Sequence, residues 1–143
     1  MNMAFILSVK GSDVVSTQPH RTLAEAAALL ASRGIGAVIV SGGDGEILGI
    51  LSERDIVRAI GRDGAAALGE PVSRHMTARV VTARPESTVE QVMDQMTALR
   101  FRHMPVIDNG RLAGIVSIGD VVKWRVEDIE TEHRAMREYI AHA

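Results

Sequence analysis

The sequence predicts a mixed α/β (α+β) fold, in which two copies of a strand–helix–strand–strand–helix unit pack sheet to sheet about a pseudo-twofold axis. Three observations predict it. Segments of the first half recur in the same order in the second half. Within each copy, apolar residues follow the periods of strands and helices. Aromatic residues make up only 3% of the 143-residue chain, so the core must be aliphatic. A long C-terminal helix is expected beyond the second copy.

The repeat covers most of the chain. VVSTQPHRTL at 14–23 matches VVTARPESTV at 80–89 with an offset of 66 residues. GILSERDIV at 49–57 matches GIVSIGDVV at 114–122 with an offset of 65, and five of the nine positions are identical. A unit of about 45 residues has too little core to be comfortably stable alone, which favours mutual packing of the Val, Ile and Leu faces of the two copies.

Each element of the first copy has its own signal. Residues 14–16 are short and β-branched, which is typical of a strand. Thr22 with Glu25 three positions later is a capping-box helix start, and Gly34 is typical of a helix end. A glycine-rich turn between two apolar segments indicates a hairpin, and Ser52 begins another helix. The hairpin strands are predicted at 36–40 and 47–51, and the second helix at 52–61.

The second copy is predicted to repeat this order. Its elements are a strand at 80–82, a helix at 88–99, strands at 103–107 and 112–116, and a helix that begins at Ser117. Pro71 and the small residues before it favour a connecting segment over a separate domain. The chain is accordingly divided into a first repeat at 1–65, a linker at 66–77, a second repeat at 78–125 and a helical extension at 126–143.

Composition and charge exclude several function classes. A net charge of −2 and a pI near 6.2 argue against a nucleic-acid partner, and the scarcity of aromatics leaves no platform for stacking bases. The chain has no cysteine, which rules out disulfides and thiolate chemistry and fits a reducing cytoplasm. The N-terminus lacks the pattern of a signal peptide, and the longest later apolar stretch, 35–40, is too short to cross a membrane. We expect a cytoplasmic protein with neither a nucleic-acid nor a membrane partner.

The Gly-Ser-Asp motif that both copies share allows two interpretations. Ser52 and Ser117 each end a strand and begin a helix, where free N–H groups and the helix dipole attract an anion. A serine hydroxyl there can bind phosphate, Asp55 and Asp120 can accept the hydroxyls of a ribose, and the glycine before them leaves room for a flat ring. The alternative is that each serine and aspartate form a capping box without any ligand. The residues alone leave both interpretations open.

Catalytic and metal sites are not indicated by the sequence. His20, His75 and His142 lack the spacing of metal ligands. No nucleophile–base or acid–base pair stands out. We therefore predict a protein that is not an enzyme and that uses neither a metal nor a catalytic cofactor.

The motif and its surroundings resemble the CBS domain, a repeat named after cystathionine β-synthase that occurs in pairs as the Bateman module. The resemblance rests on KGSDVVSTQP, IGAVIVSGGDGEILGILSERDIVRAI, HMTARVVTARPESTVEQVMDQM and FRHMPVIDNGRLAGIVSIGDVVKW, and it covers residues 8–125. It implies a stand-alone regulatory module of the bacterial type. Such a module would bind AMP, ADP, ATP, or in some cases NAD or S-adenosylmethionine, in clefts between the repeats. The resemblance also implies a homodimer and a regulated partner protein.

The same resemblance implies which residues line each cleft. Ser52 and Ser117 would face phosphate, and Asp55 and Asp120 would hold the ribose hydroxyls. The first cleft would be completed by Thr77, Arg102 and His103, and the second by Lys10, Gly36 and Ala37.

The two copies differ beside the serine. Glu53 and Arg54 in the first copy are replaced by Ile118 and Gly119 in the second. Arg54 could neutralise a phosphate, so we expect clefts that bind unequally, with Arg54 as the residue that separates them.

The C-terminal segment KWRVEDIETEHRAMREYIAHA has a heptad-like apolar pattern. Its seam residues recur at spacings of 3, 4, 3 and 4, and they are Val126, Ile129, His133, Met136 and Ile140. This helix could lie back on its own module, or it could form a dimer contact. Two functions follow as hypotheses: a ligand-sensing regulatory module, and a dimerising interaction scaffold with no nucleotide dependence.

Overall fold

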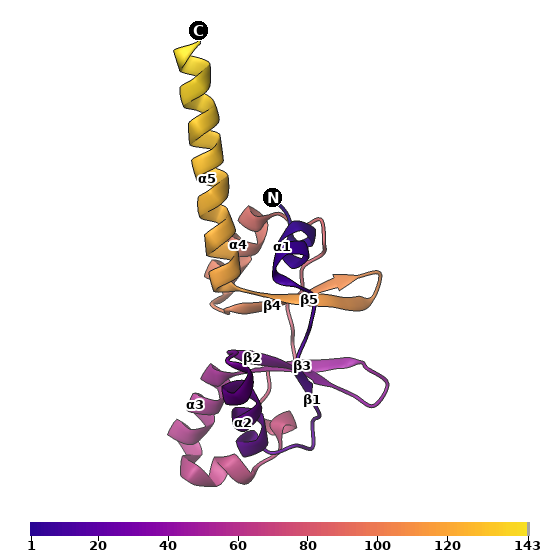
Figure 1. Cartoon of the computed structure of the whole chain (residues 1–143). Helices are drawn as coiled ribbons and strands as arrows, with labels where there is room; N and C mark the ends of the chain where they lie inside the picture. Colours follow the sequence, from indigo (N-terminus) through magenta and orange to yellow (C-terminus); the bar gives the residue numbers. More distant parts are fainter. Residues whose placement is uncertain (143) are drawn as a thin grey trace. The chain divides into compact units, whose positions relative to one another are not determined.

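The computed structural model describes residues 1–142, which form two compact units (Figure 1). Unit 2 is Val14–Val80, and unit 1 combines Met1–Asp13 with the chain from Val81 onward. The mixed α+β class, the duplicated elements and the long C-terminal helix are confirmed. The range predicted for the first repeat, 1–65, does not coincide with a compact unit, because residues 1–13 pack with the second copy.

The segment that precedes each repeat causes this difference. It forms a backbone hydrogen bond with the start of α2 or α4, the first long helix of the repeat that it does not precede. In unit 2 the N–H of Leu23 donates to the carbonyl of Glu70 at 3.0 Å, and in unit 1 the N–H of Val89 donates to the carbonyl of Met1 at 3.1 Å. The segment before each repeat therefore completes the unit formed by the other repeat.

Unit 2 contains a three-stranded sheet covered by helices. Its elements are β1 (Ser16–Thr17), α2 (Leu23–Arg33), β2 (Ala37–Ser41), β3 (Ile47–Ser52), α3 (Glu53–Asp63) and the 3₁₀ turns η1 (Gly64–Gly69) and η2 (Val72–Arg74). The sheet order is β1-β2-β3, with β1 parallel to β2 and β2 antiparallel to β3. The register pairs Ala37 with Ser52, which sets the serine at the end of its strand.

The predicted helices and strands of unit 2 form with bounds shifted by up to two residues, and the strand predicted at 14–16 is found at Ser16–Thr17, whereas the predicted linker differs. Thr22 and Glu25 form a capping box at the start of α2, and Gly34 ends the helix with a φ of 63°. The predicted linker folds into η1 and η2, and Ala67 and Val72 within it are fully buried in the core of the unit. This segment is therefore part of the packing of unit 2.

Unit 1 contains a two-stranded antiparallel sheet. Its elements are α1 (Met3–Lys10), α4 (Val89–Leu99), β4 (His103–Asp108), β5 (Arg111–Ser117) and α5 (Ile118–Ala141). The sheet pairs β4 with β5, and His103 lies opposite Ser117. The buried core consists of aliphatic and methionine side chains, including Met3, Ile6, Val92, Met96, Met104 and Val116.

The strand predicted at 80–82 does not form in the described chain. A single parallel bridge joins Ala83 to Val106 in its place. In unit 2 the N–H of Ile39 donates to the carbonyl of Val15 at 3.1 Å and extends the ladder. The position that matches Ile39 in the second copy is Pro105, which has no N–H to donate. The prediction was wrong because it rested on residues 80–82 alone and did not consider that the neighbouring strand carries Pro105.

Helix α1 was not predicted. Asn2 caps it, since its side chain accepts a 3.0 Å hydrogen bond from the N–H of Phe5. Met3, Ile6 and Leu7 lie at helical spacing, and all three are buried in unit 1. Within the described residues, no helix is both long enough and apolar enough to cross a membrane.

Candidate functional site

The Gly-Ser-Asp motifs form the same local structure in both units. In unit 2 the N–H of Ser52 donates to Oδ2 of Asp55 at 2.9 Å, and the Ser52 hydroxyl reaches the same oxygen at 3.1 Å. In unit 1 the corresponding distances from Ser117 to Asp120 are 2.9 and 3.0 Å. Each aspartate N–H donates in return to the serine hydroxyl, at 3.3 and 3.2 Å. Both motifs are therefore capping boxes at the starts of α3 and α5.

The capping box accounts for the helix starts, and it also places polar side chains where they could bind a ligand. All four side chains are partly buried at the first turn of a helix, where the positive end of the dipole lies. A hydroxyl and a carboxylate thus sit together in the first turn of each helix. This set can hold an anion and an alcohol of the same ligand.

A lysine distinguishes the two motifs. Nζ of Lys10, at the end of α1, donates to Oδ2 of Asp120 at 2.5 Å. Burial raises the pKa of Asp120, but the hydrogen bonds from Lys10 and from the N–H of Ser117 outweigh it, so the pKa lies below its ordinary value. The position that matches Lys10 in the other unit is Met76, at the same offset of 66.

The space that a side chain would occupy at Gly49 and Gly114, the glycines before the motifs, is already filled by other protein atoms. A Cβ on Gly49 would lie 2.6 Å from the carbonyl oxygen of Thr77 and 2.9 Å from the sulfur of Met76. A Cβ on Gly114 would lie 2.6 Å from Cδ2 of Leu7. The interpretation that these glycines leave room for a flat ring is therefore corrected, because the segment that enters from the other repeat already lies there.

The remaining predicted residues flank the serines of their own units. Gly36 accepts the N–H of Glu53 at 2.9 Å, and Ala37 lies opposite Ser52 in the sheet. The matching contacts in unit 1 are the N–H of Ile118 to the carbonyl of Arg102 at 2.7 Å and the pairing of His103 with Ser117. Thr77 exchanges two backbone hydrogen bonds with Ile50, at 2.9 and 3.0 Å.

The structure thus brings together two sets of predicted residues. One set, in unit 2, is Gly36, Ala37, Ser52, Arg54, Asp55 and Thr77. The other, in unit 1, is Lys10, Arg102, His103, Ser117 and Asp120. Residues of both sets were assigned to shared clefts between the repeats, and this cross-assignment stays a prediction.

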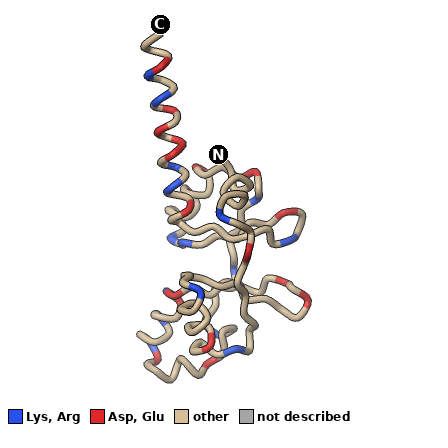
Figure 2. The backbone as a smooth tube through the Cα atoms, in the orientation of Figure 1, with Lys and Arg blue, Asp and Glu red and all other residues tan. Residues whose placement is uncertain are grey.

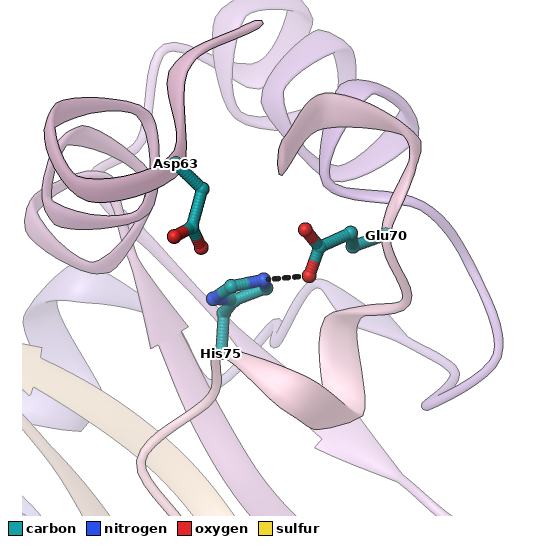
Figure 3. Close-up of side chains that lie close together, drawn as sticks. All are labelled: Asp63, Glu70 and His75. Carbon is teal, nitrogen blue, oxygen red and sulfur yellow. Dashed lines mark hydrogen bonds and ion pairs between the residues drawn. The ribbon is translucent and has the colours of Figure 1, made fainter. Parts of the chain in front are cut away.

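A polar cluster in unit 2 was missed by sequence reasoning. Ligand-type atoms of Asp63, Glu70 and His75 lie within 4.8 Å of one another (Figure 3). Nε2 of His75 lies 2.9 Å from Oε2 of Glu70, and Nδ1 lies 3.3 Å from Arg62. The His75 side chain is only 3% exposed. Both ring nitrogens have protein partners, so the cluster acts as a network that fastens the 3₁₀ turns to the end of α3.

Comparison with known proteins agrees with this architecture. The family model for the CBS domain matches residues 8–62 and 72–127. The CBS domain-containing protein YhcV of Bacillus subtilis is 32% identical over 83% of this chain and 84% of its own length. A CBS-domain containing protein from Agrobacterium tumefaciens has a solved structure with a TM-score of 0.86 and 50% identity, covering 87% of this chain and 99% of that one.

A third similar protein was solved with a ligand. The CBS domain protein of Pyrobaculum aerophilum complexed with AMP has a TM-score of 0.74 and 26% identity, and the match covers 84% of this chain and 89% of that one. The family model covers both repeats, and the relatives match over most of their own length. The chain therefore belongs to the CBS domain family, as a tandem pair.

Proposed function

We propose that this protein is a regulatory module that binds an adenine nucleotide, such as AMP, ADP, ATP or NAD, between its two CBS repeats. Binding would be passed on as a conformational change to a regulated partner protein in the cytoplasm. The observation that carries the proposal is the paired serine–aspartate arrangement at two helix starts. The AMP complex of the related Pyrobaculum protein supports a ligand that contains adenosine.

The proposed roles follow from the chemistry of the motif. Ser52 and Ser117 would turn their hydroxyls from the aspartate to a phosphate oxygen, which the helix dipole also attracts. Asp55 and Asp120 would then accept the two ribose hydroxyls in place of the serine hydroxyl. Because the ligand replaces hydrogen bonds that already exist, binding keeps the partly buried carboxylates of Asp55 and Asp120 hydrogen-bonded.

The two sites would differ in their cations. At Asp120 a ribose competes with Lys10 for Oδ2, and Lys10 is then close enough to turn toward a phosphate. At Asp55 the nearest predicted cation is Arg54, in the helix that the motif begins. We therefore propose that the two sites bind a nucleotide with unequal affinity. Lys10 would bind the phosphate at the Asp120 site, and Arg54 would bind it at the Asp55 site.

A thermal-shift panel with AMP, ADP, ATP, NAD and S-adenosylmethionine tests this function. At ligand concentrations near 100 times Kd, the melting temperature should rise by about 9 °C. Asp55→Asn and Asp120→Asn should each reduce the ligand-induced shift, measured from the variant's own ligand-free value. Asp94→Asn, on the exposed face of α4, is the matched control and should leave the shift unchanged. If no ligand at millimolar concentration shifts the melting temperature, the proposal is wrong.

The second candidate function is a dimerising scaffold that works without a nucleotide. The exposed apolar face of α5 favours it, since Ile129, Met136 and Ile140 are 49–67% exposed. In that case, deletion of residues 126–143 abolishes assembly, and no adenosine ligand changes either assembly or stability. Size-exclusion chromatography with and without AMP separates the two functions.

A further inference from the structure

Helix α5 extends well beyond the rest of unit 1 (Figure 1). It has 24 residues, and among those that the structure describes Val121 alone is buried. Val121 and Trp124, one turn apart, dock the base of the helix on the unit, and Phe5 of α1 packs edge-on against Trp124 with ring centroids 5.2 Å apart. Asp128, one turn further along, lies 3.7 Å from the N-terminal amine of Met1, and the turns of α5 beyond it leave the body of unit 1.

An apolar stripe, interrupted at His133, runs along this exposed part. Its members and their exposed fractions are Val122 at 39%, Val126 at 48%, Ile129 at 49%, Met136 at 63% and Ile140 at 67%. With 3.6 residues per turn, the stripe lies roughly 120° around the helix from the face that carries Val121 and Trp124. The two faces are therefore separate, and a partner on the stripe does not compete with unit 1.

The spacing of the stripe is that of a coiled-coil seam. Val122, Ile129 and Met136 occupy d positions, and Val126 and Ile140 occupy a positions. The a position between them is His133, which is polar. A single polar residue at an a position is a device that fixes register between two strands at some cost in stability. The stripe is thus built for another helix with a matching seam.

Charges beside the seam identify that helix. In a parallel coiled coil, each g residue faces the e residue five positions later in the partner. Arg125 then meets Glu130 of a second copy, and Glu132 meets Arg137 of a second copy. Each pairing occurs twice by symmetry, and all of them are attractive. The alternation of basic and acidic residues along α5 is visible in Figure 2.

The antiparallel arrangement does not fit the same charges. An antiparallel pair brings e residues opposite e residues. With the seam from 122 to 140 fully overlapped, Lys123 faces Arg137 of the second copy, and Glu130 faces Glu130. Both contacts are between like charges. The charge pattern therefore selects a second copy of the same chain and also its direction.

We propose that α5 forms a parallel, in-register, two-stranded coiled coil with α5 of a second copy, through the seam from Val122 to Ile140. This pairing is independent of nucleotide binding, because none of the seam residues belongs to the Ser117–Asp120 motif. The dimer would hold two nucleotide-binding modules side by side on one rigid stem.

Single cysteines test the direction, since the chain has none of its own. Ile140→Cys should form a disulfide-linked dimer under mild oxidation, because a parallel pair brings the two introduced thiols together. Glu138→Cys lies on the opposite side of the helix and is the matched control, which should stay monomeric on a non-reducing gel. A fully overlapped antiparallel pair separates the two Ile140→Cys thiols by most of the stem, so absence of the linked dimer overturns the proposal.

Charge reversal tests the partner residues. Glu132→Arg should weaken the dimer about tenfold in sedimentation equilibrium, because two attractive contacts become repulsive. Adding Arg137→Glu in the same chain should restore the dimer, since the contacts become attractive again in reversed order. Glu138→Arg, away from the seam, should leave the Kd unchanged. A wild-type protein that sediments as a monomer, or a double variant weaker than the single one, contradicts the proposal.

Discussion

The two Gly-Ser-Asp motifs have the same internal geometry and different surroundings. Their three matching hydrogen bonds differ by no more than 0.1 Å between the units. What differs is the segment that enters from the other repeat, which brings Lys10 to Asp120 in unit 1 and Met76 to Gly49 in unit 2. The helix start is set by local sequence, whereas the charge of each site is set by a distant segment.

The largest expected effect concerns the glycines before the motifs. In Gly49→Ala, the new methyl group meets the backbone carbonyl of Thr77, which cannot move without breaking its bonds to Ile50. In Gly114→Ala, it meets only the flexible end of Leu7. We expect a loss of about 3 kcal/mol in the free energy of unfolding for Gly49→Ala and about 1 kcal/mol for Gly114→Ala. Urea denaturation measures both, and equal losses would contradict the difference described here.

The capping boxes themselves should behave alike. Ser52→Ala and Ser117→Ala each remove a hydroxyl that accepts the N–H of an aspartate at the third helical position. Each substitution should cost about 1 kcal/mol of stability. Thermal unfolding of the two variants checks this, with Ser32→Ala on exposed α2 as a control expected to be near neutral. A loss of stability in only one of the two variants would contradict the view that the two motifs are equivalent helix caps.

The lysine contact should give unit 1 a pH dependence of its own. Asp120 has a lowered pKa in the folded protein, so its ionised form contributes stability that is present above its ordinary pKa of about 3.9 and is lost as pH falls through the folded-state value. Lys10→Met, which copies the residue of the other unit, should cost about 0.5 kcal/mol at pH 7, because the contact is partly exposed.

Urea denaturation at pH 7, 4 and 3 measures this difference between wild type and Lys10→Met. The difference should be largest at pH 7 and should shrink as the pH falls toward the lowered pKa of Asp120 in the folded protein. Lys123→Met removes a charge that lies over the ring of Trp124 and serves as a comparison at a site where the cation contacts an aromatic ring. A wild-type advantage that grows toward pH 3 would show that Lys10 does not act through Asp120.

Sequence reasoning succeeded where the signals are local. The helix starts at Thr22, Ser52, Thr88 and Ser117 were predictable because each capping box lies within four residues. The same holds for the hairpins, whose turns carry the required glycines. These elements were correct to within one or two residues.

The errors arose where the outcome depends on residues far apart in sequence. The strand at 80–82 failed because its partner strand has Pro105, and residues 1–13 joined unit 1 because their apolar face fits the core of the second copy. The His75 cluster was hidden because the 3₁₀ turns fold Glu70 and His75 back to the end of α3. The resemblance to CBS domains did anticipate that Lys10 lies near the Ser117–Asp120 motif.

Isothermal titration calorimetry with AMP tests the central claim most directly. The wild-type protein should show two classes of binding site with different Kd values, one lost in Asp55→Asn and the other lost in Asp120→Asn. Lys10→Met should weaken only the class that Asp120→Asn removes. Absence of binding heat at millimolar AMP, or variants that bind AMP like the wild type, would contradict the account of two unequal nucleotide sites.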